Sequence, residues 1–147
     1  MAHVRKSIRD NVVSTLTGLS ITGSNVYASR IYPLAVDKLP GIAVYTKQEE
    51  SDTITLSGNR TIDRNCTIAV EVYVYGNANY DDQLDAIAVE IEEALSADVT
   101  RGGYAKNTVI SSFTADYSGD GEYPVGTAVL NVDVRYITVE GDSETGV

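Results

Sequence analysis

The fold of this chain is decided by residues 64–95, which read RNCTIAVEVYVYGNANYDDQLDAIAVEIEEAL. The stretch begins as a strand, because apolar residues alternate with other residues from Cys66 to Val74. After the break GNAN the period becomes helical, and one apolar stripe is formed by Leu84, Ile87, Ala88, Ile91, Ala94 and Leu95. A strand with one apolar face and a helix with one apolar stripe can bury these surfaces together, so the stretch predicts a helix packed on a sheet.

Length and charge limit the class of protein. The chain has 147 residues, which is one ordinary domain with room for a core. Its formal net charge is −10. Such a charge argues against an ordinary nucleic-acid-binding protein, which needs Lys and Arg to displace counterions from phosphates. It also argues against docking on an anionic membrane.

Cysteine and hydropathy patterns exclude further classes. Cys66 is the single cysteine, so a disulfide within the chain and a thiolate metal cluster are excluded. Its position on the apolar side of the strand is typical of a small core residue. The sequence has neither a secretory apolar segment at its start nor a run of the ~20 apolar residues that span a bilayer. We therefore expect synthesis in the cytoplasm and no membrane partner.

The N-terminal segment predicts an amphipathic helix over about residues 2–16, which ends near Gly18. Arg5, Lys6 and Arg9 crowd its first turns, the end that the helix dipole makes unfavourable for cations. These residues form either a solvated face or a basic patch that meets an acidic partner, such as another copy of this chain.

Residues 42–75 predict one long hairpin with a tip at SGN, residues 57–59. Folding the chain back at Gly58 places Val44 opposite Val72, Thr46 opposite Val70, Asp52 opposite Arg64 and Ile54 opposite Ile62. The outer half, residues 48–64, has few apolar residues, and an isolated two-stranded ribbon is only marginally stable. It is therefore either a mobile loop or a protruding arm that becomes ordered against another protein.

The remaining segments complete the fold prediction. Asn79 or Asp81 is expected to cap the second helix. Residues 109–117 and 127–139 predict a second hairpin, and residues 140–147 a flexible acidic tail. The expected fold is α+β, with a mainly antiparallel or mixed sheet, two helices packed on one face and the long hairpin protruding. Residues 1–139 are expected to form a single domain.

Catalytic and metal-binding motifs are not evident in the sequence. His3 is the only histidine, and the sequence contains no Gly-rich phosphate loop and no Gly-x-Ser-x-Gly turn. The acidic runs EESD, residues 49–52, and YDDQLD, residues 80–85, could bind a divalent cation through oxygen, but neither has the spacing of a calcium loop. Solvated charge on the hairpin and at a helix start is the other interpretation, and no cofactor is expected.

Four segments resemble the tail terminator (minor tail) proteins of long-tailed bacteriophages and prophages. They are VYASRIYPL at residues 26–34, LPGIAVYT at 39–46, YDDQLDAIA at 80–88 and GEYPVG at 121–126. Their order along the chain, the first helix and the length also match, so the resemblance covers nearly the whole chain.

The resemblance implies a subunit of a homo-hexameric ring in the virion, at the head-proximal end of the tail. Such a ring caps the tail tube, stops its polymerisation and meets the head–tail connector protein, while DNA passes through without specific binding. The implied partners are further copies of the chain, the tail tube protein and the connector protein. The resemblance carries no catalytic residue.

The charged residues of the hairpin and of the first helix are the candidate contacts with other subunits or the tube: Glu50, Asp52, Arg60, Arg64, Arg5 and Arg9. Three other functions fit the same sequence. They are a head–tail completion or stopper protein, a small enzyme or ligand-binding protein that uses Asp81, Asp82 and Asp85, and an interaction module outside a virion.

Overall fold

The strand predicted from the alternating stretch lies inside the sheet, between two neighbouring strands. The computed structural model describes residues 3–28, 40–54, 60–75, 79–118 and 125–146. Within these residues six strands form one sheet in the order β1-β2-β3-β5-β4, and β6 also pairs with β5. The strands are β1 (Val26–Tyr27), β2 (Gly41–Thr53), β3 (Thr61–Tyr75), β4 (Asn107–Ser118), β5 (Val125–Val139) and β6 (Asp142–Gly146).

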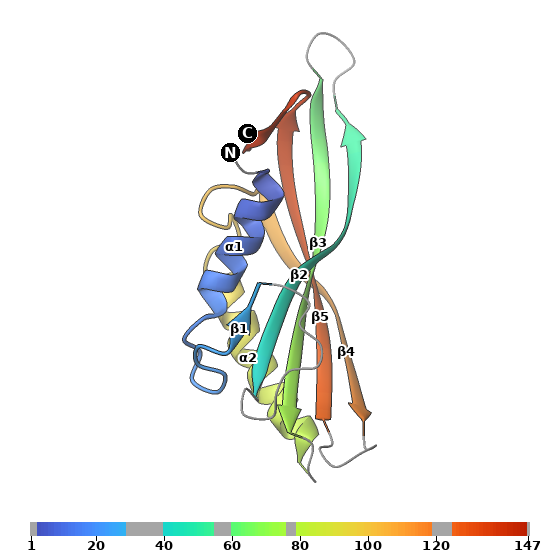
Figure 1. Ribbon diagram of the computed structural model, residues 1–147. Helices are drawn as coiled ribbons and strands as arrows, with labels where there is room; N and C mark the ends of the chain where they lie inside the picture. Colours follow the sequence, from blue (N-terminus) through green and yellow to red (C-terminus); the bar gives the residue numbers. More distant parts are fainter. Residues whose placement is uncertain (1–2, 29–39, 55–59, 76–78, 119–124, 147) are drawn as a thin grey trace.

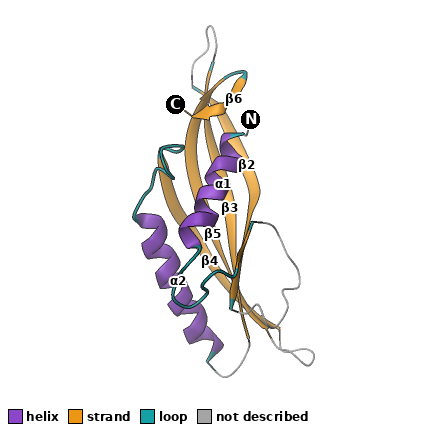
Figure 2. Cartoon of the chain, turned by 60° about the vertical axis from the view of Figure 1, so that its left-hand side comes forward, coloured by secondary structure: helices purple, strands orange, loops and turns teal. Residues whose placement is uncertain are grey.

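Two helices, α1 (Val4–Leu16) and α2 (Tyr80–Ser96), lie against one face of this sheet (Figures 1 and 2). Helix α1 packs on α2 and on strands β2, β6 and β1, whereas α2 packs on β3, β5 and β4. β1 runs parallel to β2, and the other pairs of neighbouring strands are antiparallel. The α+β class with a mixed sheet is therefore confirmed.

The core lies between the helices and the sheet, and it uses the apolar stripes that periodicity predicts. Helix α1 contributes Val4, Ile8, Val12 and Leu16, and α2 contributes the predicted stripe. β3 contributes Cys66, Ile68, Val70, Val72 and Val74, all with 0% exposure. β5 contributes every second residue from Ala128 to Tyr136. Burial of these side chains is the main favourable term in folding.

The ends of α1 follow from local sequence. His3 is the N-cap, and its Nδ1 accepts a hydrogen bond from the backbone N–H of Arg5 at 3.0 Å. Burial is the main cause that lowers the pKa of His3, which favours this neutral acceptor form. After Leu16 the chain leaves the helix through Gly18, whose φ of +96° suits glycine. Asn79, one of the two residues predicted as the cap, is the N-cap residue of α2, but its side chain makes no capping hydrogen bond.

The other face of the sheet carries no helix, and we call it the open face. Its centre is nevertheless shielded within the chain, because Thr67, Ala69, Glu71 and Tyr73 of β3 are each at most 9% exposed. Tyr45 Oη donates to Glu71 Oε1 at 2.6 Å, and Tyr73 Oη donates to Glu71 Oε2. The open face is therefore built around a hydrogen-bonded carboxylate.

No helix in the described part of the chain is long and apolar enough to span a membrane.

The predicted register of the first hairpin is wrong. Val44 pairs with Val70 and Thr46 with Ile68, whereas Ser51 and not Asp52 lies opposite Arg64. The pairing near Arg64 already differs by one residue from a symmetric fold-back at Gly58, and the bulge in β2 between Thr46 and Gln48 shifts the base of the hairpin by one residue more. Ile54 lies just beyond β2, and residues 55–59, including the expected tip, are outside the described residues.

The expectation that the outer half of the hairpin is an isolated two-stranded ribbon is also wrong. β5 accompanies β3 over its full length, from the pair Tyr75–Val125 to the pair Thr61–Val139. Residues 48–53 and 61–64 of the expected arm therefore belong to a wider sheet. A ribbon with a third strand needs fewer apolar residues of its own, because the added ladder supplies hydrogen bonds and side-chain contacts.

The C-terminal residues are also more ordered than expected. Asp142–Gly146 form β6 instead of a frayed tail. Gly141, at φ +86°, permits the tight turn from β5, and β6 takes the place beside β5 that β4 leaves beyond Arg135. The strand expected from Val26 to Tyr32 is described only as Val26–Tyr27, since residues 29–39 lie outside the described residues.

The buried thiol gives a test of this packing. Burial raises the pKa of Cys66 to about 12, from an ordinary value of 9.0. The thiolate is thus disfavoured in the folded state, and the free energy of unfolding should fall by about 1 kcal/mol from pH 9 to pH 10 as the unfolded thiol ionises. Urea unfolding at both pH values measures this fall, and Cys66→Ala should largely abolish it. An unchanged fall in that variant, or rapid labelling of the native thiol at pH 8, would contradict the burial.

Candidate functional site

The structure divides the six predicted contact residues among three places. Arg5, Arg9 and Arg64 lie on the helix side of the sheet, where they bind groups of the same chain. Glu50 and Asp52 line the open face. Arg60 directly precedes β3, near the end of the hairpin, apart from the other five predicted residues. The six residues therefore do not form one cluster.

A polar anchor of four residues joins the start of α1 to the sheet: Arg5, Glu49, Arg64 and Tyr136. Glu49 Oε2 accepts from Arg5 Nη1 at 2.7 Å and from Arg64 Nη1 at 3.1 Å. Glu49 Oε1 accepts from the hydroxyl of Tyr136. The Glu49 side chain is only 10% exposed, so its two cationic partners offset the cost of removing the carboxylate from water.

Neighbouring contacts complete the polar anchor. Arg64 Nε donates to Thr138 Oγ1 at 3.0 Å, and the guanidinium lies 5.9 Å from the centre of the Tyr136 ring. Burial, followed by the hydrogen bond to Glu49, raises the pKa of Tyr136 well above its ordinary value. One turn along α1, Arg9 Nη1 donates to Thr46 Oγ1 at 3.0 Å. The basic residues at the start of α1 thus fix the helix on its own sheet.

The bulge in β2 decides which glutamate enters the polar anchor. Before the bulge the even-numbered residues of β2 point to the helices, as Ile42 and Val44 do in the core. The extra residue at Lys47 reverses the alternation, so Glu49 points to the helices and Glu50 to the open face. Sequence reasoning missed Glu49 because a bulge leaves no strong local signal in a strand.

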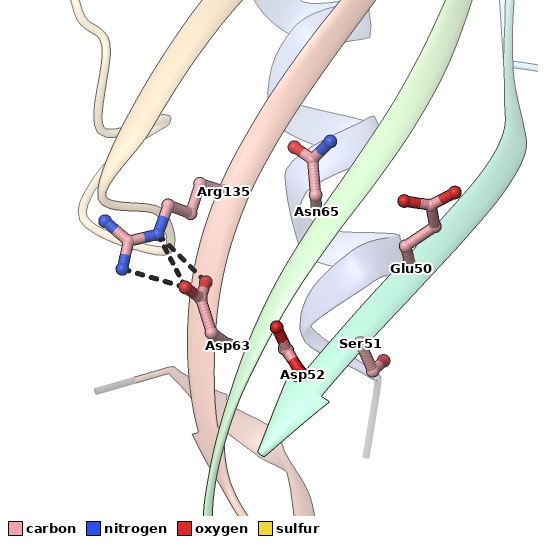
Figure 3. Close-up of a pocket in the computed structure, with 6 residues that line it drawn as sticks. All are labelled: Glu50, Ser51, Asp52, Asp63, Asn65 and Arg135. Carbon is pink, nitrogen blue, oxygen red and sulfur yellow. Dashed lines mark hydrogen bonds and ion pairs between the residues drawn. The ribbon is translucent and has the colours of Figure 1, made fainter. Parts of the chain in front are cut away.

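Acidic side chains dominate the outer part of the open face (Figure 3). A hollow of about 490 Å³ is lined by Glu50, Ser51, Asp52, Asp63, Asn65 and Arg135. Arg135 forms an ion pair with Asp63. Its Nε donates to Oδ1 at 2.9 Å and to Oδ2 at 3.0 Å, and its Nη2 lies 2.9 Å from Oδ2. This hydrogen bonding raises the pKa of Arg135. Asp52 lies directly opposite Asp63 in the ladder, so two acids share this part of the face.

The acidic surface continues along the sheet. A second hollow of about 300 Å³ includes Lys47, Gln48 and Asp133, and a third of about 560 Å³ includes Tyr45 and Glu71. Together the hollows contain five carboxylates, from Glu50, Asp52, Asp63, Glu71 and Asp133, and two cations, from Lys47 and Arg135. The open face is therefore a long, shallow surface with an excess of negative charge.

At the hairpin end, Arg60 forms a two-pronged ion pair with Glu140, with contacts of 2.7 Å and 2.6 Å. The backbone N–H of Glu140 also donates to the carbonyl of Arg60. The hydrogen bond from Arg60 lowers the pKa of Glu140. Both side chains are more than 40% exposed, so this pair remains available to a partner and contributes little to stability.

The second acidic run shows no metal-binding arrangement. Asp81, Asp82 and Asp85 are exposed on the first turns of α2, where their negative charge interacts favourably with the positive end of the helix dipole. Among the described residues, no group of three His, Cys, Asp or Glu side chains could hold a metal ion.

A family model described as "Phage minor tail protein U" matches residues 3–136. Among solved structures, the chain is similar to one from the "Virion of native gene transfer agent (GTA) particle", with 12% sequence identity and a TM-score of 0.47. That alignment covers 95% of this chain and 96% of the other. No curated protein sequence matches the chain.

Proposed function

Since the chain belongs to the phage minor tail protein U family, we propose that this structural tail protein is the ring-forming terminator of a phage tail. In this role a homo-hexameric ring caps the tail tube at its head-proximal end, stops polymerisation and offers a surface to the head–tail connector protein. The observation that supports the proposal most is the family match itself, because residues 3–136 include both helices and nearly all of the sheet.

The open face supports a role in a ring through which DNA passes. Its five carboxylates outnumber its two cations, and the whole chain has a net charge of −10. A surface of this sign repels phosphates, so DNA can slide along it without being held. We therefore assign the open face, with Glu50 and Asp52, to the lumen of the ring.

The hairpin end is the proposed contact with the tail tube. Arg60 and Glu140 are both exposed there, and Ile54 is 51% exposed just beyond β2. Protein interfaces combine an apolar centre with a polar rim, and here Ile54 would supply the apolar contact and the Arg60–Glu140 pair the polar rim. Arg64, by contrast, is a poor probe of this contact, because its charge reversal would also break the polar anchor.

We expect the purified chain to form rings on the ends of purified tail tubes and to stop further addition of tube protein. Arg60→Glu should weaken this capping about tenfold, since it places like charge beside Glu140 and reverses the sign that the tube meets. Electron microscopy of tube ends, together with tube length after addition of fresh tube protein, measures both effects.

Glu140→Gln is the matched control, because it removes the Arg60 ion pair without changing Arg60 itself. This variant should cap tubes as the wild type does. Equal loss in both variants would mean that the pair acts within the fold. A wild-type chain that ignores tube ends but binds purified connector protein would replace the terminator with a stopper function.

A further inference from the structure

An apolar groove lies between helix α2 and the sheet, beside strand β4. Its volume is about 290 Å³, and five of its seven lining residues are apolar. The lining residues are Asp85, Ala88, Val89, Glu92, Ile110, Phe113 and Leu130. Val89 on α2 is 51% exposed, and Phe113 on β4 is 43% exposed. Two large apolar side chains exposed at one groove are typical of a contact with another molecule.

Two carboxylates border this groove, and we therefore call it the acidic groove. Asp85 and Glu92 are both exposed on α2, and their separation of seven residues is about two helical turns, or about 10 Å. Val89 lies between them on the same side of the helix. Neither carboxylate has an ion-pair partner among the described residues. The acidic groove thus presents an apolar centre with a negative charge toward each end.

The charge of α2 opposes the helix when the chain is alone. The helix YDDQLDAIAVEIEEALS has six acidic residues and no Lys or Arg. Asp81 and Asp85 lie one turn apart and repel each other. Glu93 lies in the last turn, where its charge meets the negative end of the helix dipole. A cationic partner would relieve both effects, so the charge pattern favours a basic occupant.

A second copy of this chain is a poor source of such cations. Six described cations are already held within the chain, five of them in ion pairs and Arg101 in a buried position. The five in ion pairs are Arg5, Lys6, Arg60, Arg64 and Arg135. A second copy also carries a net charge of −10, which repels the acidic groove at a distance. Charge complementarity therefore indicates a different protein.

We propose that the acidic groove binds a basic amphipathic helix of another virion protein. An apolar side chain of that helix covers Val89 and Phe113, as in other complexes where a helix lies in a groove. Two Lys or Arg side chains about two turns apart pair with Asp85 and Glu92. The inference goes beyond the proposed function, because it requires neither a ring nor a tube end.

Photo-cross-linking in assembled tails tests which molecule covers the acidic groove. Val89 of the full chain is replaced by benzoylphenylalanine, the tails are irradiated, and the captured peptide is sequenced by mass spectrometry. The expected peptide comes from another virion protein and has apolar residues at helical spacing between Lys or Arg residues. The same replacement at Val99, which is 39% exposed outside the groove, should not capture this peptide.

Three outcomes of the cross-linking would overturn the inference. Capture of a segment of this chain would show that a second copy covers the groove, and it would leave the proposed ring standing. Capture of a segment without cations would remove the role of the two carboxylates. Tails that assemble but give no adduct at residue 89 would show that the groove stays exposed. Failure of the chain to cap tubes, by contrast, would overturn the terminator function alone.

Binding of the captured peptide to the full chain measures the role of charge. Asp85→Asn with Glu92→Gln should weaken binding about tenfold, because two ion pairs are lost. Glu93→Gln with Glu144→Gln removes the same charge from exposed positions outside the groove and should weaken binding less than about twofold. Fluorescence anisotropy of the labelled peptide gives both values. Equal weakening by the two pairs would mean that net charge alone attracts the peptide, and would overturn the inference.

A matched pair of apolar variants tests the centre of the groove. Val89→Ser should weaken binding of the same peptide about fivefold, because an apolar contact is lost. Val99→Ser, at an exposed position outside the groove, should leave binding unchanged. Circular dichroism should show the same helix content in both variants, since both side chains are exposed. Equal binding by Val89→Ser and the wild type would remove the groove from the contact.

Discussion

Replacing Arg101 by leucine is expected to lower the free energy of unfolding by about 3 kcal/mol. Arg101 is fully buried beyond the end of α2. Its Nη2 donates to the backbone carbonyls of Leu95 and Asp98, and its Nη1 donates to Asn11 Oδ1 at 3.3 Å. The last carbonyls of a helix have no partner within the helix, and a cation there also favours the helix dipole.

The loss in Arg101→Leu comes mainly from carbonyls that remain buried without a donor. Part of this loss is offset, because the buried charge of Arg101 itself costs free energy. Burial lowers the pKa of Arg101, and its Nε has no hydrogen-bond partner among the described residues. Urea unfolding followed by circular dichroism measures the difference.

Two further variants define the source of the Arg101 effect. Asn11→Ala removes only the link to α1 and should cost about 1 kcal/mol. Arg101→Lys keeps the charge with fewer fixed donors and should fall between this value and that of leucine. A loss below about 1 kcal/mol for Arg101→Leu would mean that water replaces the guanidinium at the carbonyls.

Replacing Glu49 by leucine is expected to cost a similar amount, about 3 kcal/mol, because it leaves Arg5 and Arg64 without their shared carboxylate. The hydroxyl of Tyr136 also loses its acceptor. Since these contacts join α1 to the sheet, amide hydrogen exchange should rise first in α1, before the centre of β3. Urea unfolding and exchange measured by mass spectrometry check the two parts of the prediction.

The neighbouring acid is the matched control for Glu49. Glu50→Leu changes the same side chain one position along β2, but on the exposed open face, and should alter stability by less than about 0.5 kcal/mol. Adding Arg64→Met to Glu49→Leu should recover part of the loss, because a buried unpaired cation is removed. Equal effects of Glu49→Leu and Glu50→Leu would refute the assignment of Glu49 to the polar anchor.

The elements with strong periodicity could be predicted from the sequence. The stripes of α1 and α2 and the alternation in β3 each repeat over several turns or residue pairs, so one local pattern identifies both the element and its buried side. The opening helix, the central strand and the second helix were therefore predicted with nearly the observed bounds. The glycine at residue 18 likewise marked the end of α1.

The pairing between distant segments could not be predicted in the same way. Arg60 meets Glu140, Arg135 meets Asp63, and Glu49 meets Tyr136, across separations of more than 70 residues. Such pairs depend on β5 lying along the whole of β3, which no local pattern specifies. The sequence identified charged residues in the hairpin, but it could not separate those buried under α1 from those on the open face.

The bulge at Lys47 decides which face of the sheet each residue in the outer half of β2 occupies. If Lys47 instead paired with Thr67 in a regular ladder, the base of the strand would keep its place and every residue from 48 to 53 would exchange sides. Glu50 would then enter the interior and Glu49 would lie on the open face. Deletion of Lys47 would make the pairs Thr46–Ile68 and Gln48–Thr67 consecutive in a regular ladder, so Glu49 and Glu50 would keep their sides. The bulge thus allows the strand to carry one extra residue without exchanging its two surfaces.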